Sequence, residues 1–291
     1  MLRLVLPKGS LERATLELLD DSDLQVSRPS DVDYHASIDD PRVDDVRILR
    51  PQEIPRYVAE GRFDLGITGR DWIEETGSDV VTLTELHYSK ASARPVRVVL
   101  AVDTDSTIES IGDLPSGSRV HTEYPDLTRR FLEKHGVDAE VVLSYGATEA
   151  KVPDIADAVV EITETGRALR AAGLRIVDTL LVSHTELIAN PTAHQEPEKR
   201  QAMEEIEMLL TGTLEARGQV LVKLNVEEPQ LEGVLALLPA LRSPTISALA
   251  GDGGYAVEAV VAKTEINTLI PALRNAGATG IIELPIAKIV Q

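Results

Sequence analysis

The chain has 291 residues, 43% of them hydrophobic, which suffices for the cores of two or three domains of ordinary size. Its 29 basic and 48 acidic residues give a net charge of −19, and only 3% of residues are aromatic, which argues against a nucleic-acid partner. The absence of cysteine excludes disulfides and thiolate chemistry, and no run of about 20 apolar residues indicates a membrane partner or span.

The first part of the chain alternates short apolar strands with helices. It opens with a strand at 3–6, and the apolar start is too short for a signal peptide, so we expect a cytoplasmic protein. Further strands are expected at 46–49, 63–68 and 80–83, with helices at 11–19, 51–60 and from Trp72 onward. This alternation predicts a mostly parallel sheet.

A second α/β unit follows. The strands expected in it lie at 96–102, 118–121, 139–143 and 174–181, with helices at 125–134, from Gly146, and at 198–211. The chain up to residue 211 is therefore expected to form two lobes, joined by crossovers near 88–96 and 176–190. Ligands of such sheets bind beyond the carboxyl ends of strands, so a cleft between the lobes is the expected pocket.

The end of the chain has a different order of elements. Strands are expected at 219–226, 246–249, 257–262 and 280–284, helices at 230–241 and 265–276, and a hairpin turn at 252–255. The order βαββαβ predicts a ferredoxin-like domain.

The stretch 157–169 has the pattern of a phosphate site. An apolar strand leads through Thr163, Thr165 and Gly166 into a short helix, where free backbone N–H groups and the helix dipole favour an anion. Glu161 lies four residues before Thr165 and could accept hydrogen bonds from sugar hydroxyls. The pattern therefore suggests a ribose 5-phosphate ligand. The alternative is a capped helix without a ligand, with Thr165 as the N-cap.

Several short segments, in order along nearly the whole chain, resemble the long form of the ATP phosphoribosyltransferase family, the first enzyme of histidine biosynthesis. They are Leu6–Leu11, Ile48–Pro51, Asp64–Asp71, Thr122–Pro125, Gly146–Glu149, Ala156–Glu161, Thr163–Gly166, Ala216–Gly218 and Ser243–Thr245. The resemblance implies an α/β fold with a two-lobed, periplasmic-binding-protein-like catalytic part and a C-terminal ferredoxin-like regulatory domain. The implied boundaries are 1–90 with 180–213 for lobe I, 91–179 for lobe II, and 214–291 for the regulatory domain.

The resemblance also implies a reaction. Adenine N1 of ATP attacks the anomeric carbon of phosphoribosyl pyrophosphate (PRPP), giving phosphoribosyl-ATP and pyrophosphate. Catalysis would come chiefly from positioning the substrates and neutralising the leaving group. Two alternatives stay open: a phosphoribosyltransferase for another base, and a non-enzymatic two-lobed protein that binds a small molecule.

The resemblance places PRPP on the Thr/Gly turn. The residues implied to contact it are Glu161, Thr163, Glu164, Thr165, Gly166, Arg167 and Ala168. Glu161 would bind the ribose hydroxyls, whereas Asp157, at the start of the strand, is expected to be structural. Phosphoribosyl loops often read Thr-Gly-x-Thr, and here Ala168 stands at the last position, so one hydroxyl donor is missing.

Two basic residues that follow strands complete the implied catalytic set. Lys8 and Arg50 would contact substrate phosphate or pyrophosphate, and with Glu161 they are the candidate catalytic residues. The residues implied to contact ATP are Asp71, Tyr124 and Glu149.

Mg²⁺ is the implied cofactor. It prefers oxygen ligands and would be bound mainly through the substrate phosphates, so no dedicated metal cluster of the protein is expected. Five of the six histidines are scattered along the chain without ligand spacing: His87, His121, His135, His184 and His194.

The resemblance implies feedback inhibition by histidine at the C-terminal domain. Asn225 and Thr245 are the candidate contacts, with Val260 as an apolar wall. Residues 211–291 hold six basic and eight acidic residues, so this part of an acidic chain is nearly neutral. Low charge favours packing of the domain against copies of itself, and the resemblance implies a homo-oligomer, a hexamer with a dimer as the smaller form.

Overall fold

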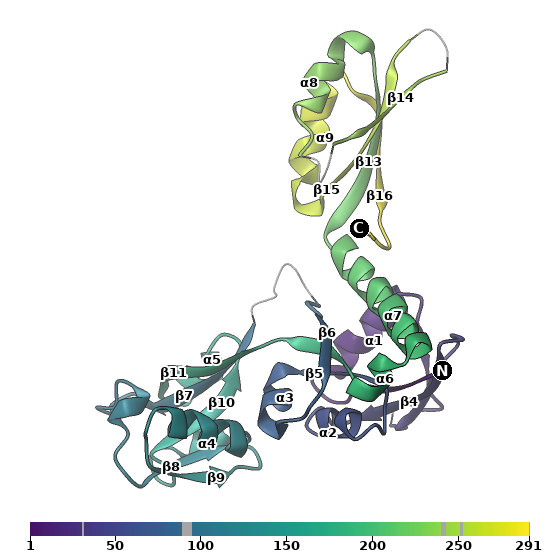
Figure 1. Ribbon diagram of the computed structural model, residues 1–291. Helices are drawn as coiled ribbons and strands as arrows, with labels where there is room; N and C mark the ends of the chain where they lie inside the picture. Colours follow the sequence, from purple (N-terminus) through teal and green to yellow (C-terminus); the bar gives the residue numbers. More distant parts are fainter. Residues whose placement is uncertain (31, 89–94, 240–242, 251–252, 291) are drawn as a thin grey trace. The chain divides into compact units, whose positions relative to one another are not determined.

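The computed structural model describes residues 1–30, 32–88, 95–239, 243–250 and 253–290 (Figure 1). They divide into two compact units. One contains Met1–Glu17, Leu24–His87 and the described residues 95–207. The other contains Leu18–Asp23, Tyr88 and the described residues from Met208 onward.

The first sheet of the larger unit has seven strands in the order β2-β3-β4-β1-β5-β12-β6. These are β1 Leu2–Pro7, β2 Val26–Ser27, β3 His35–Ile38, β4 Val43–Leu49, β5 Leu65–Gly69, β6 Val81–Glu85 and β12 Thr185–Ala189. Helices α2 (Ile54–Ala59) and α3 (Arg70–Thr76) pack against Val5 on one face, through side chains such as Val58 and Ile73. Helix α1 (Glu12–Asp21) follows β1, and α6 (Pro191–Gln195) follows β12.

The prediction of a mostly parallel sheet was wrong, because the first sheet is mixed. Strand β1 pairs in parallel with β4 and β5, but β12 lies antiparallel between β5 and β6, and β3 is antiparallel to β4. Parallel neighbours need a long crossover connection. Strand β12 instead follows the last strand of the second sheet after a single residue, His184. It lies within 176–190, the segment that we expected to be a crossover between the lobes.

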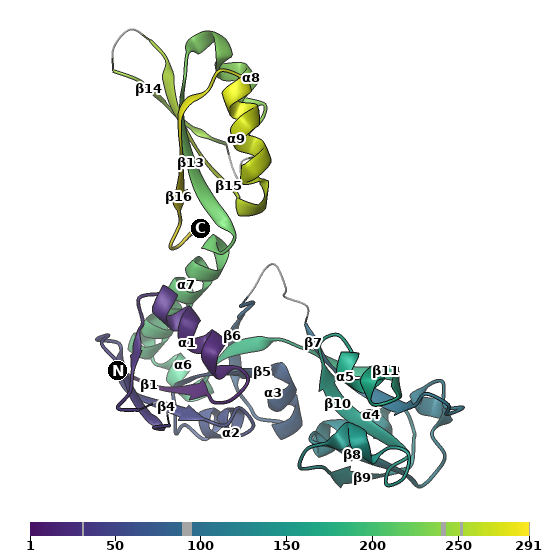
Figure 2. The ribbon, with the colours of Figure 1, turned by 180° about the vertical axis from the view of Figure 1, so that it is seen from behind.

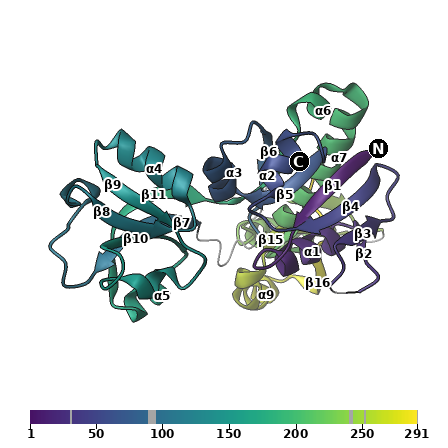
Figure 3. The same cartoon turned by 90° about the horizontal axis from the view of Figure 1, so that it is seen from below.

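The second sheet has five strands in the order β11-β7-β10-β8-β9 and is also mixed. These are β7 Val96–Asp103, β8 Ser118–Thr122, β9 Ala139–Leu143, β10 Ala158–Thr163 and β11 Leu174–Ser183. Helices α4 (Pro125–Lys134) and α5 (Arg167–Ala171) cover opposite faces (Figure 3). Alternate residues of β7 supply the two cores: Val98 and Leu100 pack on the α4 side, and Val99 on the α5 side.

The helix expected from Gly146 is only the 3-10 turn Thr148–Lys151. Gly146 and Ala147 both have a positive φ, 114° and 47°, which no residue inside a right-handed helix can adopt. Glu149 therefore lies on a tight turn just after β9.

The C-terminal sheet confirms the ferredoxin-like prediction. Its antiparallel strands follow the order β14-β15-β13-β16, and α8 and α9 cover one face (Figure 2). The elements are β13 Gln219–Val226, α8 Leu231–Leu235, β14 Thr245–Ala248, β15 Tyr255–Ala262, α9 Ile266–Asn275 and β16 Thr279–Pro285. Helix α8 is shorter than predicted. Residues 240 and 241 of the expected helix and 252 of the expected hairpin turn lie outside the described residues.

Helix α7 (Pro197–Ala216) precedes this sheet. Within the described part of the chain, neither α7 nor any other helix is long and apolar enough to span a membrane.

Asp64 connects three elements of the larger unit. Its carboxylate, on a residue 2% exposed, accepts hydrogen bonds from Arg3 N (2.9 Å) and Arg3 Nε (3.2 Å) in β1. Lys199 Nζ in α7 adds a contact at 3.3 Å. Burial by itself would raise the pKa of Asp64, but the hydrogen bonds and charge of Arg3 outweigh it and hold the pKa below its usual range. The ionised carboxylate therefore stabilises the junction of β1 and β5.

We expect Asp64→Asn to lower the free energy of unfolding by about 2 kcal/mol at neutral pH, because hydrogen bonds to a charged group are lost. The folded pKa is depressed, so the contribution of Asp64 is present above the unfolded pKa of about 3.9 and is lost as the pH falls through the folded pKa. Urea unfolding of both proteins from neutral to acidic pH measures the difference, which should shrink on acidification.

The matched control is Glu60→Gln, which removes the exposed ion pair with Arg62 at 3.9 Å. Its effect should stay within about 0.5 kcal/mol. An equal loss in both variants, or a loss from Asp64→Asn that does not depend on pH, would contradict the assignment.

Candidate functional site

Two basic residues lie at the carboxyl ends of neighbouring parallel strands of the first sheet. Lys8 follows β1 and Arg50 follows β4, and Lys8 N donates a hydrogen bond to Leu49 O at 2.7 Å. A Cβ built on Gly9 would lie 3.9 Å from Arg50 Nη1, and Lys8 Nζ stands 4.4 Å from the centre of the Tyr34 ring. Because parallel strands end at one edge of a sheet, the fold brings the two cations to the same edge.

Asp71 lies at that edge too, just after β5, and is 4% exposed. One carboxylate oxygen accepts a hydrogen bond from Ser183 Oγ at 2.6 Å, and the other accepts one from Tyr124 Oη at 2.9 Å. Burial raises the pKa of Asp71, and these two hydrogen bonds oppose the shift in part. Burial and the neighbouring Asp71 also raise the pKa of Tyr124, so its hydroxyl remains a donor.

The helix that carries Asp71 also reaches the second sheet's helix α4. Glu75 of α3 accepts hydrogen bonds from Leu127 N (2.8 Å) and Asp126 N (3.1 Å) in the first turn of α4. The ring of Trp72 packs on Tyr124 with 4.6 Å between centroids. Glu75 caps α4 from outside the helix, since the first amides of a helix lack intrahelical partners. Helix α3 thus links the two sheets through both polar and aromatic contacts.

Three acidic residues lie near one another at the carboxyl ends of β8, β9 and β10. Glu161 of β10 is half-buried, and burial raises its pKa. The negative charges of Glu123 and Glu149 raise the pKa further, while a hydrogen bond from Thr148 lowers it. Carboxylate oxygens are the ligand type of hard divalent cations.

The predicted phosphate loop is closed by its own hydrogen bonds. Thr163 Oγ1 accepts a hydrogen bond from Gly166 N at 2.8 Å, and Thr165 O accepts one from Arg170 Nη2 at 3.0 Å. Gly166 has φ +70°, a backbone conformation that favours glycine, and the nearest atom to a Cβ built there is Arg170 Nη1 at 2.9 Å, the end of a flexible side chain. Helix α5 has only five residues, so it adds a smaller dipole than a longer helix would.

The remaining loop residues are exposed: Glu164, Thr165, Arg167 and Ala168. Asp157 is structural as predicted, because its carboxylate accepts a hydrogen bond from Arg119 N at 2.8 Å and so ties the start of β10 to β8.

A cavity of about 530 Å³ lies between the strand ends of the two sheets. Its volume is within the usual range for small-molecule sites, about 300–1,000 Å³. The lining residues lie after β1, β4 and β8, at or after the end of β5, at the start of β7, at the end of β10, or at the β11–β12 junction. They are Ser10, Leu11, Pro51, Gln52, Gly69, Asp71, Trp72, Val96, Glu123, Tyr124, Ile162, Thr163, Glu164, Ser183, His184 and Thr185. The expected cleft between the two lobes is therefore present in this unit.

The cavity wall contains four of the predicted site residues: Asp71, Tyr124, Thr163 and Glu164. The other predicted residues lie outside the wall: Lys8, Arg50, Glu149, Glu161, Thr165, Gly166, Arg167 and Ala168. Sequence reasoning missed Trp72, Ser183 and His184. No local motif marks them, because each depends on how α3 and the β11–β12 junction meet the second sheet.

The three residues of the C-terminal domain that are candidates for binding the inhibitor histidine share one face of its sheet. Val220, Val222 and Leu224 point to the core under α8 and α9, so Asn225 points to the opposite face. Val260 pairs with Leu221, and Thr245 pairs with Glu258, which places both side chains on that same face. The structure thus gathers the candidates on the side of the sheet that the helices leave open.

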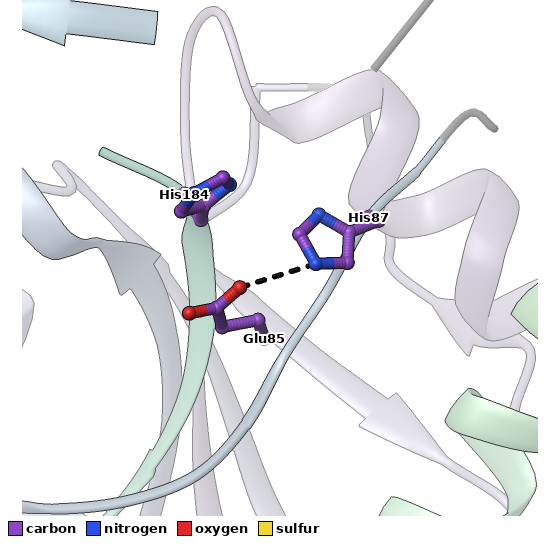
Figure 4. A group of neighbouring side chains, drawn as sticks. All are labelled: Glu85, His87 and His184. Carbon is purple, nitrogen blue, oxygen red and sulfur yellow. Dashed lines mark ion pairs between the residues drawn. The ribbon is translucent and has the colours of Figure 1, made fainter. Parts of the chain in front are cut away.

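Two of the histidines described as scattered come together. Glu85, His87 and His184 lie side by side (Figure 4), each offering a ligand atom within 4.8 Å of the others. The expectation of no protein metal ligands rested on sequence spacing, and spacing could not detect this group because its members come from distant segments.

The comparisons with known proteins agree along the chain. A family model described as ATP phosphoribosyltransferase matches residues 50–212, and one described as HisG, C-terminal domain, matches 216–288. Proteins named ATP phosphoribosyltransferase from Chlorobium phaeovibrioides and Pelodictyon phaeoclathratiforme are each 48% identical over 291 residues, covering 100% of this chain and 98% of each relative. A solved ATP phosphoribosyl transferase (HisG:HisZ) complex from Thermotoga maritima is similar over 72% of this chain and 98% of that chain, with 25% identity and a TM-score of 0.61.

Tyr124→Phe removes one donor to the buried Asp71 carboxylate, and we expect it to cost about 1–3 kcal/mol of unfolding free energy at neutral pH. The pKa of Asp71 is higher in the folded protein than in the unfolded chain. The free energy of unfolding therefore falls as the pH rises from the pKa of the unfolded chain to that of the folded protein. Loss of the donor raises that pKa further. The stability difference from the unsubstituted protein should therefore be larger at pH 7 than at pH 4 in urea unfolding.

Tyr145→Phe is the control, because Tyr145 is 93% exposed. It should leave stability unchanged at both pH values. A Tyr124→Phe effect that is absent, or that is larger at the acidic pH, would disprove the role given to the Tyr124 hydroxyl.

Proposed function

The chain belongs to the ATP phosphoribosyltransferase family, and we propose that it binds PRPP on the Thr163–Ala168 loop, beside the cavity between the two sheets. Its reaction transfers the 5-phosphoribosyl group from PRPP to N1 of ATP with release of pyrophosphate, the first step of histidine biosynthesis. Two alternatives were open: another base as the acceptor, and binding without catalysis. The relatives that match the full length of the chain favour neither.

The conformation of the loop carries the proposal for the 5′-phosphate. Gly166, with its positive φ, turns the chain at the end of β10 and leaves Thr165, Arg167 and Ala168 exposed. The backbone amides and the Thr165 hydroxyl are the donors proposed for the phosphate oxygens, and Arg167 would add positive charge. Ala168 contributes its amide only, so the loop relies more on the backbone than a loop with Thr at this position.

The pyrophosphate end of PRPP would meet Lys8 and Arg50. Their cationic groups would neutralise the charge that develops on the leaving group, which lowers the barrier without covalent chemistry. Glu161 would hold the ribose hydroxyls, since its half-buried carboxylate lies just before the loop. Phosphoribosyl-transfer enzymes are generally metal-dependent. When bound, Mg²⁺ would offset charge on the pyrophosphate, held mainly by substrate phosphates with the carboxylates of Glu123, Glu149 and Glu161 nearby.

ATP would occupy the cavity beside PRPP. Tyr124 lines it, while both carboxylate oxygens of Asp71 are used within the protein. Asp71 would therefore act by positioning Tyr124 and the cavity wall, and Glu149 would approach ATP or the ribose from the turn after β9. A location in the cytoplasm remains a prediction from the sequence.

The direct test mixes the purified full chain with ATP, PRPP and Mg²⁺ and follows the absorbance of phosphoribosyl-ATP. Turnover that requires all three components is expected. Turnover with another base but not with ATP would refute the acceptor, and tight small-molecule binding without any turnover would refute the catalytic assignment.

Thr165→Val should raise the KM for PRPP about tenfold or more, because a hydrogen bond to a charged group is worth about 1.5–3 kcal/mol. The KM for ATP should change little. Steady-state kinetics with each substrate varied in turn provide the measurement. Thr165→Ser, which keeps the hydroxyl, is the matched control and should stay near the original KM; a KM for PRPP unmoved by valine would show that the loop does not hold the phosphate.

Histidine inhibition is proposed at the open face of the C-terminal sheet, where Asn225 and Thr245 offer polar side chains beside Val260. Asn225→Ala should raise the histidine concentration needed for half-inhibition about tenfold, because a hydrogen bond to a charged amino acid is lost. Asn267→Ala, on the exposed side of α9, is the control. Equal sensitivity of all three proteins to histidine would place the inhibitor elsewhere.

The same open face supports the proposal of a homo-oligomer. Leu284 and Ile282 pair with Leu221 and Lys223 on it and are 39% and 52% exposed. Exposed apolar side chains of this kind mark interaction surfaces. Sedimentation should show a hexamer, with a dimer as the smaller form. A monomer at micromolar concentration, with and without histidine, is the result that would contradict this.

A further inference from the structure

Glu85, His87 and His184 form a compact group of metal-ligand types beside the cavity (Figure 4). His87 Nε2 lies 3.1 Å from a carboxylate oxygen of Glu85. The rings of His87 and His184 stand edge to face, with 5.0 Å between centroids. Glu85 and His87 are exposed and His184 is half-buried, so an ion could reach all three side chains from solvent.

The backbone under this group is held in place by hydrogen bonds. Leu86 N donates to Thr185 O at 2.7 Å, which fixes the segment after β6 against the β11–β12 junction. Arg70 N donates to His184 O at 2.8 Å, and Glu85 pairs with Glu186 in the sheet. Only side-chain torsions are therefore left to be fixed when a ligand binds, which keeps the entropic cost of assembling the site low.

The chemistry of the three donors selects a class of ion. Two imidazoles and one carboxylate suit Zn²⁺, Co²⁺ and similar transition metals, whereas Mg²⁺ prefers oxygen ligands. Zn²⁺ binds such nitrogens and oxygens at about 2.0–2.2 Å. Ligand atoms already within 4.8 Å of one another can reach that geometry through side-chain rotation, with a fourth position left for water.

We propose that Glu85, His87 and His184 bind one divalent transition-metal ion of the Zn²⁺ class, separate from the Mg²⁺ expected with PRPP. The ion joins the two segments through which the chain passes between the sheets: the residues after β6, and His184 between β11 and β12. His184 also lines the cavity, so the bound ion fixes one part of the cavity wall. This inference goes beyond phosphoribosyl transfer and does not depend on it.

The test uses the full chain after removal of metals with a chelator. Co²⁺ is titrated in while its visible absorption is recorded, and Zn²⁺ binding is measured by calorimetry, with and without excess Mg²⁺. The variants are His87→Gln, His184→Gln and Glu85→Gln. The control is His135→Gln, because His135 is exposed and contacts Phe131 away from the group.

One ion per chain should bind, and excess Mg²⁺ should not displace it. Residues that only support metal ligands contribute about 10–100-fold in affinity, so loss of either histidine ligand should weaken binding by at least that factor. His135→Gln should bind as the unsubstituted protein does. Zn²⁺ should also raise the melting temperature of the unsubstituted and His135→Gln proteins but not of the histidine-ligand variants, because only the folded chain presents the site.

Three outcomes would overturn the proposal. They are no binding of Co²⁺ or Zn²⁺ at micromolar concentration, binding by the histidine-ligand variants that is as tight as that of the unsubstituted protein, and displacement of the bound ion by Mg²⁺. Catalytic activity is not part of this readout, so its result stands apart from that of the phosphoribosyl-transfer assay. Glu85→Gln keeps both imidazoles and tests the carboxylate independently if a histidine variant folds poorly.

Discussion

The Asp71 carboxylate is buried at the end of β5, and a buried charge is tolerated only where hydrogen bonds replace the lost water. Ser183 and Tyr124 supply those bonds from two distant parts of the chain. Satisfying this one group therefore brings the first sheet, the β11–β12 junction and the second sheet's β8 turn together. The cavity between the strand ends depends on that meeting, and Glu75 reinforces it by capping α4.

Strand direction explains why the chemistry gathers where it does. In the first sheet β4, β1 and β5 are parallel, so Lys8, Arg50 and Asp71 emerge at one edge. In the second sheet β9, β8 and β10 are parallel, so Glu149, Glu123 and Thr163 emerge together. One edge offers cations suited to phosphates, and the other offers carboxylates and a glycine turn suited to a sugar phosphate. The antiparallel strands β12 and β7 leave these edges intact.

Much of this could be predicted from local patterns. The strand at Ala158–Thr163, the turn at Gly166 and the ferredoxin-like order of the last domain follow from apolar periodicity and glycine placement. Strand β12 was missed because a short apolar stretch in a connecting segment carries no sign of its pairing partner. The helix expected at Gly146 failed for a local reason, since two successive residues with positive φ cannot continue a helix.

The order of amino acids alone determined most element types, the strand–turn–helix of the loop proposed to bind PRPP and, through resemblance, the family that the comparisons confirmed. Folding decided which distant residues meet: Asp71 with Tyr124 and Ser183, Glu75 with the start of α4, and Glu85 with His87 and His184. The physical reason is that torsional preferences and hydrophobic periodicity act over a few residues, whereas these contacts depend on strand order and direction. Those are set by the packing of the whole chain.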